Sequence, residues 1–249
     1  MGIGPQFADL DADGRLDLLT GCFEGYLWMA RGTEDGFAAP TRMRDSSGAE
    51  FHTGMYWSDA ESTWIEGGDH TMAVTPLDWD GDGDLDLVTG STNGHFRVRE
   101  NTGTRTEPAF ATTTTQVLGT DGEPLEVPGG DAAPRFVDWD GDGTLDILTG
   151  SAFGGVHWFR GTGSGADRRF EAPRMLVADP GNKLPARLGQ GTLIRTQADA
   201  ADIDGDGDLD LFVGGAVQIE KEGGSIGFSG PIQLFARTEV GRYGDAAAK

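Results

Sequence analysis

Apolar and polar residues follow one pattern that recurs four times along this chain. In each recurrence a short apolar segment leads into alternating aspartates, and a second apolar segment follows and ends in glycine. Short apolar runs bounded by glycine and aspartate are typical of β-strands. The aspartate runs, each with the strand expected after it, are DLDADGRLDLLTG from Asp9, DWDGDGDLDLVTG from Asp78, DWDGDGTLDILTG from Asp138 and DIDGDGDLDLFVGG from Asp202.

After the strand that follows the aspartate run, most repeats contain two further segments with strand character. A third apolar segment begins after a glycine turn, at Gly25, Gly94, Gly154 and Gly230. Three repeats add a fourth, within residues 37–43, 110–118 and 170–177, and the fourth repeat would begin its own near Tyr243. Helical periodicity is weak because 41 of the 249 residues are glycine. Four short strands per repeat, joined by glycine-rich turns, predict the blades of a β-propeller.

The recurrence divides the chain into four units of one domain. The aspartate runs start 69, 60 and 64 residues apart (78 − 9, 138 − 78 and 202 − 138). A period of this kind indicates repeats that bury their apolar faces against their neighbours. We predict one all-β domain over 1–249, with four-stranded antiparallel blades in a four-bladed ring or as part of a larger propeller. The units lie at about 5–45, 72–120, 133–180 and 198–245, with an insertion at 46–71.

The charge of the chain limits its partners. The formal net charge is −22, from 41 acidic and 19 basic residues, which argues against nucleic acid or an anionic membrane as a partner. Eighteen of the acids (4 + 5 + 4 + 5) lie in the four aspartate runs, so cations are the expected partners. No apolar run is long enough to predict a membrane span. Cys22 is the only cysteine, which excludes an intramolecular disulfide.

The spacing of the aspartates predicts four calcium sites, one per repeat. Calcium takes six to eight oxygen ligands, and aspartates at alternate positions of a tight turn can direct carboxylates to one centre. Glycine at the sixth position permits the positive φ of such a turn. The seventh position accepts Arg or Thr as well as Asp, so we expect its main-chain carbonyl to be the ligand. The candidate ligands are Asp9, Asp11, Asp13, Arg15 and Asp17; Asp78, Asp80, Asp82, Asp84 and Asp86; Asp138, Asp140, Asp142, Thr144 and Asp146; and Asp202, Asp204, Asp206, Asp208 and Asp210.

Other interpretations of these loops fit the residues less well. An EF-hand needs glutamate at position twelve and flanking helices, whereas this chain has Thr20, Thr89, Thr149 and Val213 there. Zinc prefers His or Cys, and magnesium demands strict octahedral geometry. A metal-free Asp-Gly turn does not need four clustered carboxylates. We therefore expect calcium to stabilise each hairpin, with the aspartate at position nine closing the site.

The repeated Asp-x-Asp-x-Asp-Gly-x-x-Asp-Leu segment, followed by a strand and glycine, resembles the FG-GAP/VCBS repeats of integrin α-subunit propellers and of many bacterial extracellular proteins. The resemblance covers all four units, from Phe7 to Arg242. It implies a calcium-binding propeller, although integrin-like members have seven blades. It does not specify a function, because repeats of this type serve adhesion, carbohydrate binding and enzyme-associated roles.

The insertion at 46–71 contains the main candidates for ligand binding. Tyr56, Trp57 and Trp64 are aromatic side chains suited to stacking on a sugar ring. An ordered loop that caps the first blade explains them equally well. The residues for hydrolytic chemistry, including the carboxylate pair of a glycoside hydrolase, are also available there. These residues are His52, Asp59, Glu61, Glu66 and His70.

Other distinctive residues have structural explanations. We expect His95 and His157 to lie on third strands and face neighbouring blades, and Trp79 and Trp139 to pack between blades. The loop that begins at Ala216 is expected to share a face with the insertion.

We predict a calcium-stabilised, non-catalytic binding or scaffold module for protein or carbohydrate ligands. We expect an extracellular, cell-surface or periplasmic location, where millimolar calcium fills sites of moderate affinity. The chain shows no leader, so a targeting segment would lie outside it. The alternative is a polysaccharide-active or other hydrolytic enzyme, or a lectin, that uses the insertion.

Overall fold

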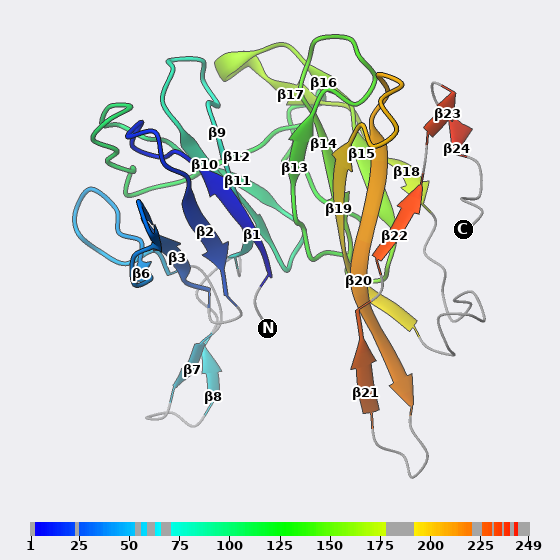
Figure 1. Cartoon of the computed structure of the whole chain (residues 1–249), viewed down its shortest axis with the longest axis horizontal. Coiled ribbons are helices and arrows are strands. Elements are labelled where there is room, and N and C mark those ends of the chain that lie inside the picture. Colours follow the sequence, from blue (N-terminus) through cyan, green and yellow to red (C-terminus); the bar gives the residue numbers. More distant parts are fainter. Residues whose placement is uncertain are drawn as a thin grey trace.

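A computed structural model shows an all-β protein. It describes residues 3–22, 25–52, 56–58, 63–65, 71–177, 192–220, 226–230, 232–235, 237–239 and 242–243. Within these residues four antiparallel sheets are arranged as a four-bladed β-propeller (Figure 1). The predicted fold class is therefore confirmed. No helix among the described residues is long and apolar enough to cross a membrane.

Blades one to three share one strand order, in which each strand pairs antiparallel with the next one outward. The first strand of each blade lies at the propeller axis, and the aspartate run forms the turn into the second strand. Blade one contains β1 (Ile3–Ala8), β2 (Asp17–Gly21), β3 (Leu27–Ala30) and β6 (Thr41–Arg42). Blade two contains β9 (Thr71–Leu77), β10 (Asp86–Ser91), β11 (Phe96–Arg99) and β12 (Thr115–Gln116). Blade three contains β13 (Arg135–Val137), β14 (Asp146–Gly150), β15 (Val156–Phe159) and β18 (Arg174–Val177).

Short hairpins lie in the connections between the strands of the blades. The insertion contains one of them, β7 (Tyr56–Ser58) paired with β8 (Thr63–Ile65). Two others lie between the third and fourth strands of blades one and three, and the short helix η1 (Gly165–Asp167) interrupts the second of these. They are β4 (Gly32–Thr33) with β5 (Gly36–Phe37), and β16 (Gly161–Thr162) with β17 (Arg169–Phe170).

Blade four differs from the others beyond its second strand. β19 (Thr192–Ala201) pairs with β20 (Asp210–Glu220), and β20 then pairs with β22 (Ile232–Phe235) along its first half. The second half of β20 pairs with β21 (Ile226–Ser229). The segment after Ala216, expected as a loop, thus forms a hairpin, because strand pairing continues through residues 217–220. In Figure 1 this hairpin and β7–β8 extend toward the same end of the molecule.

The expected outer strand of blade four does not join its sheet within the described residues. β24 (Arg242–Tyr243) lies where the repeat alignment places that strand, but it pairs with β23 (Arg237–Glu239). The last position of this blade is therefore open in the part of the chain that the structure describes.

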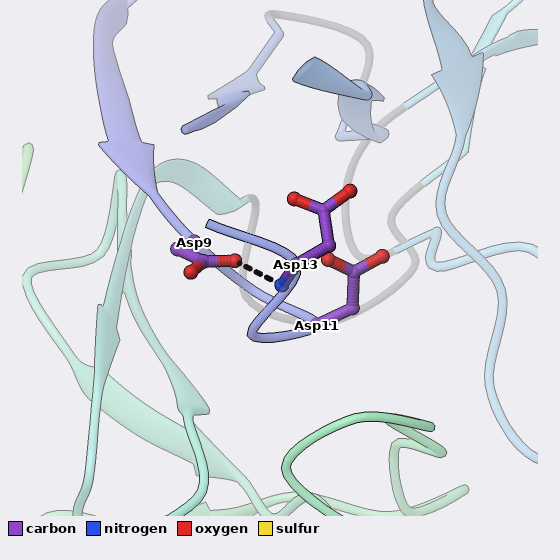
Figure 2. Close-up of side chains that lie close together, drawn as sticks. All are labelled: Asp9, Asp11 and Asp13. Atoms are coloured by element: carbon purple, nitrogen blue, oxygen red, sulfur yellow. Dashed lines mark hydrogen bonds between the residues drawn. The ribbon is translucent and has the colours of Figure 1, made fainter. Parts of the chain in front are cut away.

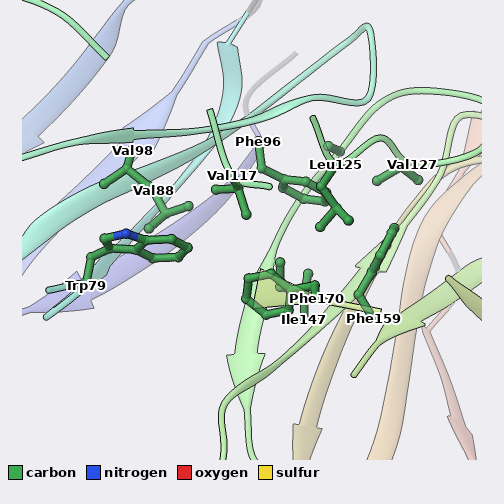
Figure 3. Close-up of a cluster of buried hydrophobic side chains, with 11 residues drawn as sticks. Trp79, Val88, Phe96, Val98, Val117, Leu125, Val127, Ile147, Phe159 and Phe170 are labelled. Carbon is green, nitrogen blue, oxygen red and sulfur yellow. The ribbon is translucent and has the colours of Figure 1, made fainter. Parts of the chain in front are cut away.

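Three apolar clusters hold adjacent blades together. Blade one meets blade two through Leu19 and Val74, and blade three meets blade four through Leu148 and Leu211. The largest cluster lies between blades two and three, where Phe96 and Phe159 meet edge to face (Figure 3). Burial of such side chains stabilises a fold by about 1.5–3 kcal/mol each, so these interfaces form the core of the protein.

The exposure of the second residue of each aspartate run shows whether a neighbouring blade covers it. Leu10, Trp79 and Trp139 are 1%, 9% and 2% exposed, whereas Ile203 in the fourth run is 51% exposed. Trp79 packs against Phe136 of blade three, with ring centroids 6.1 Å apart. The prediction that Trp79 and Trp139 pack between blades is confirmed. Ile203 is exposed because no described residue of blade one covers it.

The space around a glycine near the end of the second strand also differs between blade four and blades two and three. A Cβ atom on Gly90 would lie 2.2 Å from the carbonyl oxygen of Ala132 in blade three. A Cβ on Gly150 would lie 1.9 Å from that of Thr196 in blade four. A Cβ on Gly214 would meet no atom within 4 Å. We call the boundary between blades four and one the open seam, because the described residues show no such close backbone approach at Gly214.

Candidate metal centres

The four aspartate runs form the turns between the first and second strands of the blades, and we call them loops 1 to 4. In Figure 1 these turns lie at one end of the propeller, opposite the hairpins β7–β8 and β20–β21. Positions are numbered from the first aspartate of each loop, so Asp9, Asp78, Asp138 and Asp202 are at position one.

Left-handed backbone at two positions shapes each turn. The glycine at position six has a φ between 86° and 95° in every loop, as the sequence predicted. Position four also has positive φ: it is glycine in three loops and Ala12 (φ 55°) in loop 1. This second requirement was not predicted from the sequence, although glycine at position four in three loops is a visible signal of it.

Backbone N–H groups orient the carboxylates of each loop. In loop 3, Asp138 accepts hydrogen bonds from the N–H of Asp142 (3.0 Å) and of Gly143 (2.8 Å). The N–H of Thr144 donates to Asp142 at 2.8 Å. Position seven donates to position five in the other loops as well. Main-chain hydrogen bonds thus hold the carboxylates in place without the help of a ligand.

The aspartate at position nine is the most buried acid of each loop. Asp17, Asp86, Asp146 and Asp210 are at most 2% exposed. In each loop it accepts the backbone N–H of position two. In blades one to three it also accepts the N–H of the second residue after the third strand, for example Gly161 at 2.6 Å. Position nine therefore ties three strands of a blade together, a role that the sequence analysis missed.

Three carboxylates converge in every loop, with ligand oxygens within 4.8 Å of one another. Loops 1 and 4 gather positions one, three and five, and Figure 2 shows the three aspartates of loop 1. Loops 2 and 3 gather positions one, three and nine. The four sets are Asp9, Asp11 and Asp13; Asp78, Asp80 and Asp86; Asp138, Asp140 and Asp146; and Asp202, Asp204 and Asp206.

Burial makes several of these acids hard to ionise without a cation. Desolvation raises the pKa of Asp86 to about 6, and it also raises the pKa of Asp146. Asp84 is 5% exposed, and desolvation, followed by the nearby charge of Asp82, raises its pKa. Asp142 differs: the hydrogen bond from the Thr144 N–H is the main cause that lowers its pKa.

In loops 1 and 3, arginine holds one oxygen of the position-three carboxylate. Arg160 Nε donates to Asp140 Oδ2 at 2.6 Å, and Arg31 pairs with Asp11 Oδ2. The other oxygens, Asp140 Oδ1 and Asp11 Oδ1, are buried with no hydrogen-bond partner among the described residues. A buried carboxylate oxygen without a donor is costly, and a cation within the loop would satisfy it.

Each of the first two loops also contacts the following blade. Arg105 of blade two donates from Nη1 to the carbonyl oxygen of Asp9 at 2.7 Å. The guanidinium of Arg168 in blade three lies 4.9 Å from the ring centroid of Trp79. Loops 1 and 2 are therefore part of the blade interfaces, so the conformation of these loops depends on how the blades pack in the ring.

The remaining sequence candidates lie apart from the loops or outside the description. His52 lies beside Tyr26 of blade one, with ring centroids 4.5 Å apart. The backbone of β7–β8 places Trp57 opposite Trp64, but their side chains and that of Tyr56 lie outside the described residues. Asp59, Glu61, Glu66 and His70 also lie outside them.

His157 is buried in blade three and should make stability depend on pH. It is 4% exposed, and desolvation lowers its pKa below the usual 6.5. Because the unfolded chain then binds more protons, stability is fully present above pH 6.5 and declines as the pH falls through the lowered pKa. Urea unfolding at pH 7.5 and 5.5 should show a smaller loss of stability for His157→Gln than for the wild type. Equal losses in the two proteins would contradict this.

The fold and loops define a class of protein: a β-propeller in which every blade carries an acidic turn between its first two strands. The family profile of the FG-GAP-like repeat matches residues 9–89, 78–149 and 138–213. Together these matches cover residues 9–213, or 205 of the 249 (213 − 9 + 1). The chain belongs to the FG-GAP-like repeat family. A comparison with curated proteins found no match.

Proposed function

We propose that this protein is a calcium-loaded binding or scaffold module that works outside the cytoplasm. The FG-GAP-like repeats and the propeller fold support a binding or scaffold role. The observation that carries the calcium proposal is the buried, unpartnered oxygen of Asp11 and of Asp140, each within a cluster of three carboxylates. Hard oxygen donors in a pliable loop are the donor set of calcium.

Calcium would supply a positive charge that lets the clustered carboxylates stay ionised inside the blade interfaces. The residues that would hold it are the converging triads of the four loops. Two carboxylates about 4 Å apart repel by about 1 kcal/mol even at the dielectric of water, and the desolvated Asp86 and Asp146 add to this cost. Arg31 and Arg160 would act as positioning residues, because they hold the position-three carboxylate in one orientation.

The extracellular part of the proposal follows from the expected affinity. Most of the carboxylates in these loops are exposed or half-buried, so each ion would keep contact with solvent. Extracellular modules bind calcium with dissociation constants of about 10⁻⁴–10⁻³ M. Such sites fill in millimolar calcium and would be empty in the cytosol.

The direct test is the number of calcium ions bound. Isothermal titration of the chelated protein should give about four ions per chain, one for each acidic loop. Asp140→Ala should reduce the number to about three, because it removes a converging carboxylate of loop 3. Asp167→Ala is the matched control, since this acid is exposed in η1 and belongs to no cluster. Absence of calcium binding, or unchanged stoichiometry in Asp140→Ala, would refute the assignment.

A further inference from the structure

The axis of the propeller contains a cavity that the metal loops do not explain. Its volume is about 520 Å³, within the range of about 300–1,000 Å³ that is typical of small-molecule sites. The first strands of all four blades line it, together with Phe212, Gly214 and Ile232 beside the open seam. Glycine, alanine and proline form most of its wall, so the space is not filled by side chains.

One residue of each first strand forms a polar layer in this cavity. Gln6, Thr75, Arg135 and Asp199 each lie three residues before position one of their loop, so they share one register. Their cross-strand partners are Leu19, Val88, Leu148 and Phe212. The polar residue therefore occurs at the same height in all four blades, while the residues around the layer are mostly small or apolar.

The layer keeps free donors and acceptors after its internal bonds are made. Arg135 bonds to Asp199 Oδ1 at 2.7 Å and to Gln6 Oε1. Thr75 donates its hydroxyl to the carbonyl of Pro134. Asp199 Oδ2, an acceptor, and Arg135 Nη2 and Gln6 Nε2, two donors, take no part in these bonds and are available to a ligand. The Asp199 side chain is 54% exposed, so a ligand can reach it.

We propose that this cavity binds a small neutral polyhydroxyl ligand of the size of a monosaccharide. Each hydroxyl both donates and accepts, which matches the mixture of free groups on Asp199, Arg135 and Gln6. An anion only accepts and would face Asp199, and a cation only donates and would face Arg135. The apolar C–H faces of a sugar would contact Pro134 and Phe212, which line the wall.

The wall of the cavity at the open seam is less covered than its other walls. The counterparts of Phe212 in the other blades, Leu19, Val88 and Leu148, are all fully buried by the following blade. Phe212 is only partly buried, and Ile232 beside it is 77% exposed. Among the described residues, the least covered wall of the cavity therefore lies between blades four and one.

This inference rests on the proposed role as a binding module and specifies its ligand. The test is saturation-transfer NMR and calorimetry on the calcium-saturated protein with glucose, galactose, mannose, fucose and N-acetylglucosamine, and with glycine as a zwitterionic comparison. Ligands of about 12 non-hydrogen atoms bind with millimolar affinity at ordinary efficiency. At least one sugar should therefore saturate in this range. Saturation by glycine alone, or by nothing, would overturn the proposal.

Two variants locate the site. Asp199→Ala and Gln6→Ala should weaken the sugar at least tenfold, because they remove hydrogen bonds to its hydroxyls. Asp35→Ala, an exposed acid outside the cavity, should bind as the wild type does. Unchanged affinity in Asp199→Ala would also overturn the proposal. Thermal melting of each variant with and without calcium reports folding and the calcium role, so a failure of sugar binding is distinguishable from a failure of the calcium proposal.

Discussion

Chelation of calcium should lower the melting temperature of this protein by about 8 °C or more. Calcium at 5 mM is about 5–50 times the dissociation constants expected for these sites, so each site stabilises the native state by about 1–2.3 kcal/mol, and four independent sites contribute about 4–9 kcal/mol. A change of 1 kcal/mol moves the melting temperature of a domain of 150–250 residues by about 2–4 °C. Since domains are stable by only about 5–15 kcal/mol, the chelated chain should be close to unfolding.

Differential scanning calorimetry in 5 mM calcium and in excess chelator measures this shift directly. Calcium added back should restore the transition, whereas magnesium should do so poorly, because it gives up its waters reluctantly. Equal restoration of the transition by both ions would indicate that non-specific charge neutralisation is sufficient. A melting temperature that does not change on chelation would show that the loops fold without metal.

Substitution of Gly150 by alanine should destabilise the protein by about 3 kcal/mol or more. The new Cβ would lie 1.9 Å from the carbonyl oxygen of Thr196, and a backbone atom cannot move aside as a flexible side chain can. The expected fall in melting temperature is about 6–12 °C. The interface between blades three and four must open to accept even one methyl group.

Gly214→Ala is the matched control for this prediction. Gly214 holds the equivalent position in blade four, and a Cβ there meets no atom within 4 Å. The substitution should change stability by no more than about 0.5 kcal/mol, or stabilise slightly by restricting the unfolded chain. Chemical unfolding of both variants in calcium measures the difference. A loss at Gly214 as large as at Gly150 would mean that the seam packs as the other interfaces do.

The sequence predicted the fold class because the same local signals recur in phase four times. Alternating aspartates fix the turns, and the leucine-rich segments after them form second strands with buried inward faces. Blade four was predicted less well. The strand tendency of residues 217–220 is satisfied by a hairpin with β21, which no repeat alignment contains.

The sequence by itself determined the repeat, its strands and the candidate metal ligands, because these depend on residues close together in the chain. Only the tertiary structure decided what lies between blades. Buried Asp146 links strands of its blade because it accepts a hydrogen bond from the N–H of Gly161, fifteen residues away. The exposure of Ile203 and the free space at Gly214 depend on whether blade one covers them. The axial layer of Gln6, Thr75, Arg135 and Asp199 has a constant place in the repeat, but the bonds of Arg135 to Asp199 and Gln6 form only because four separate strands converge on one axis.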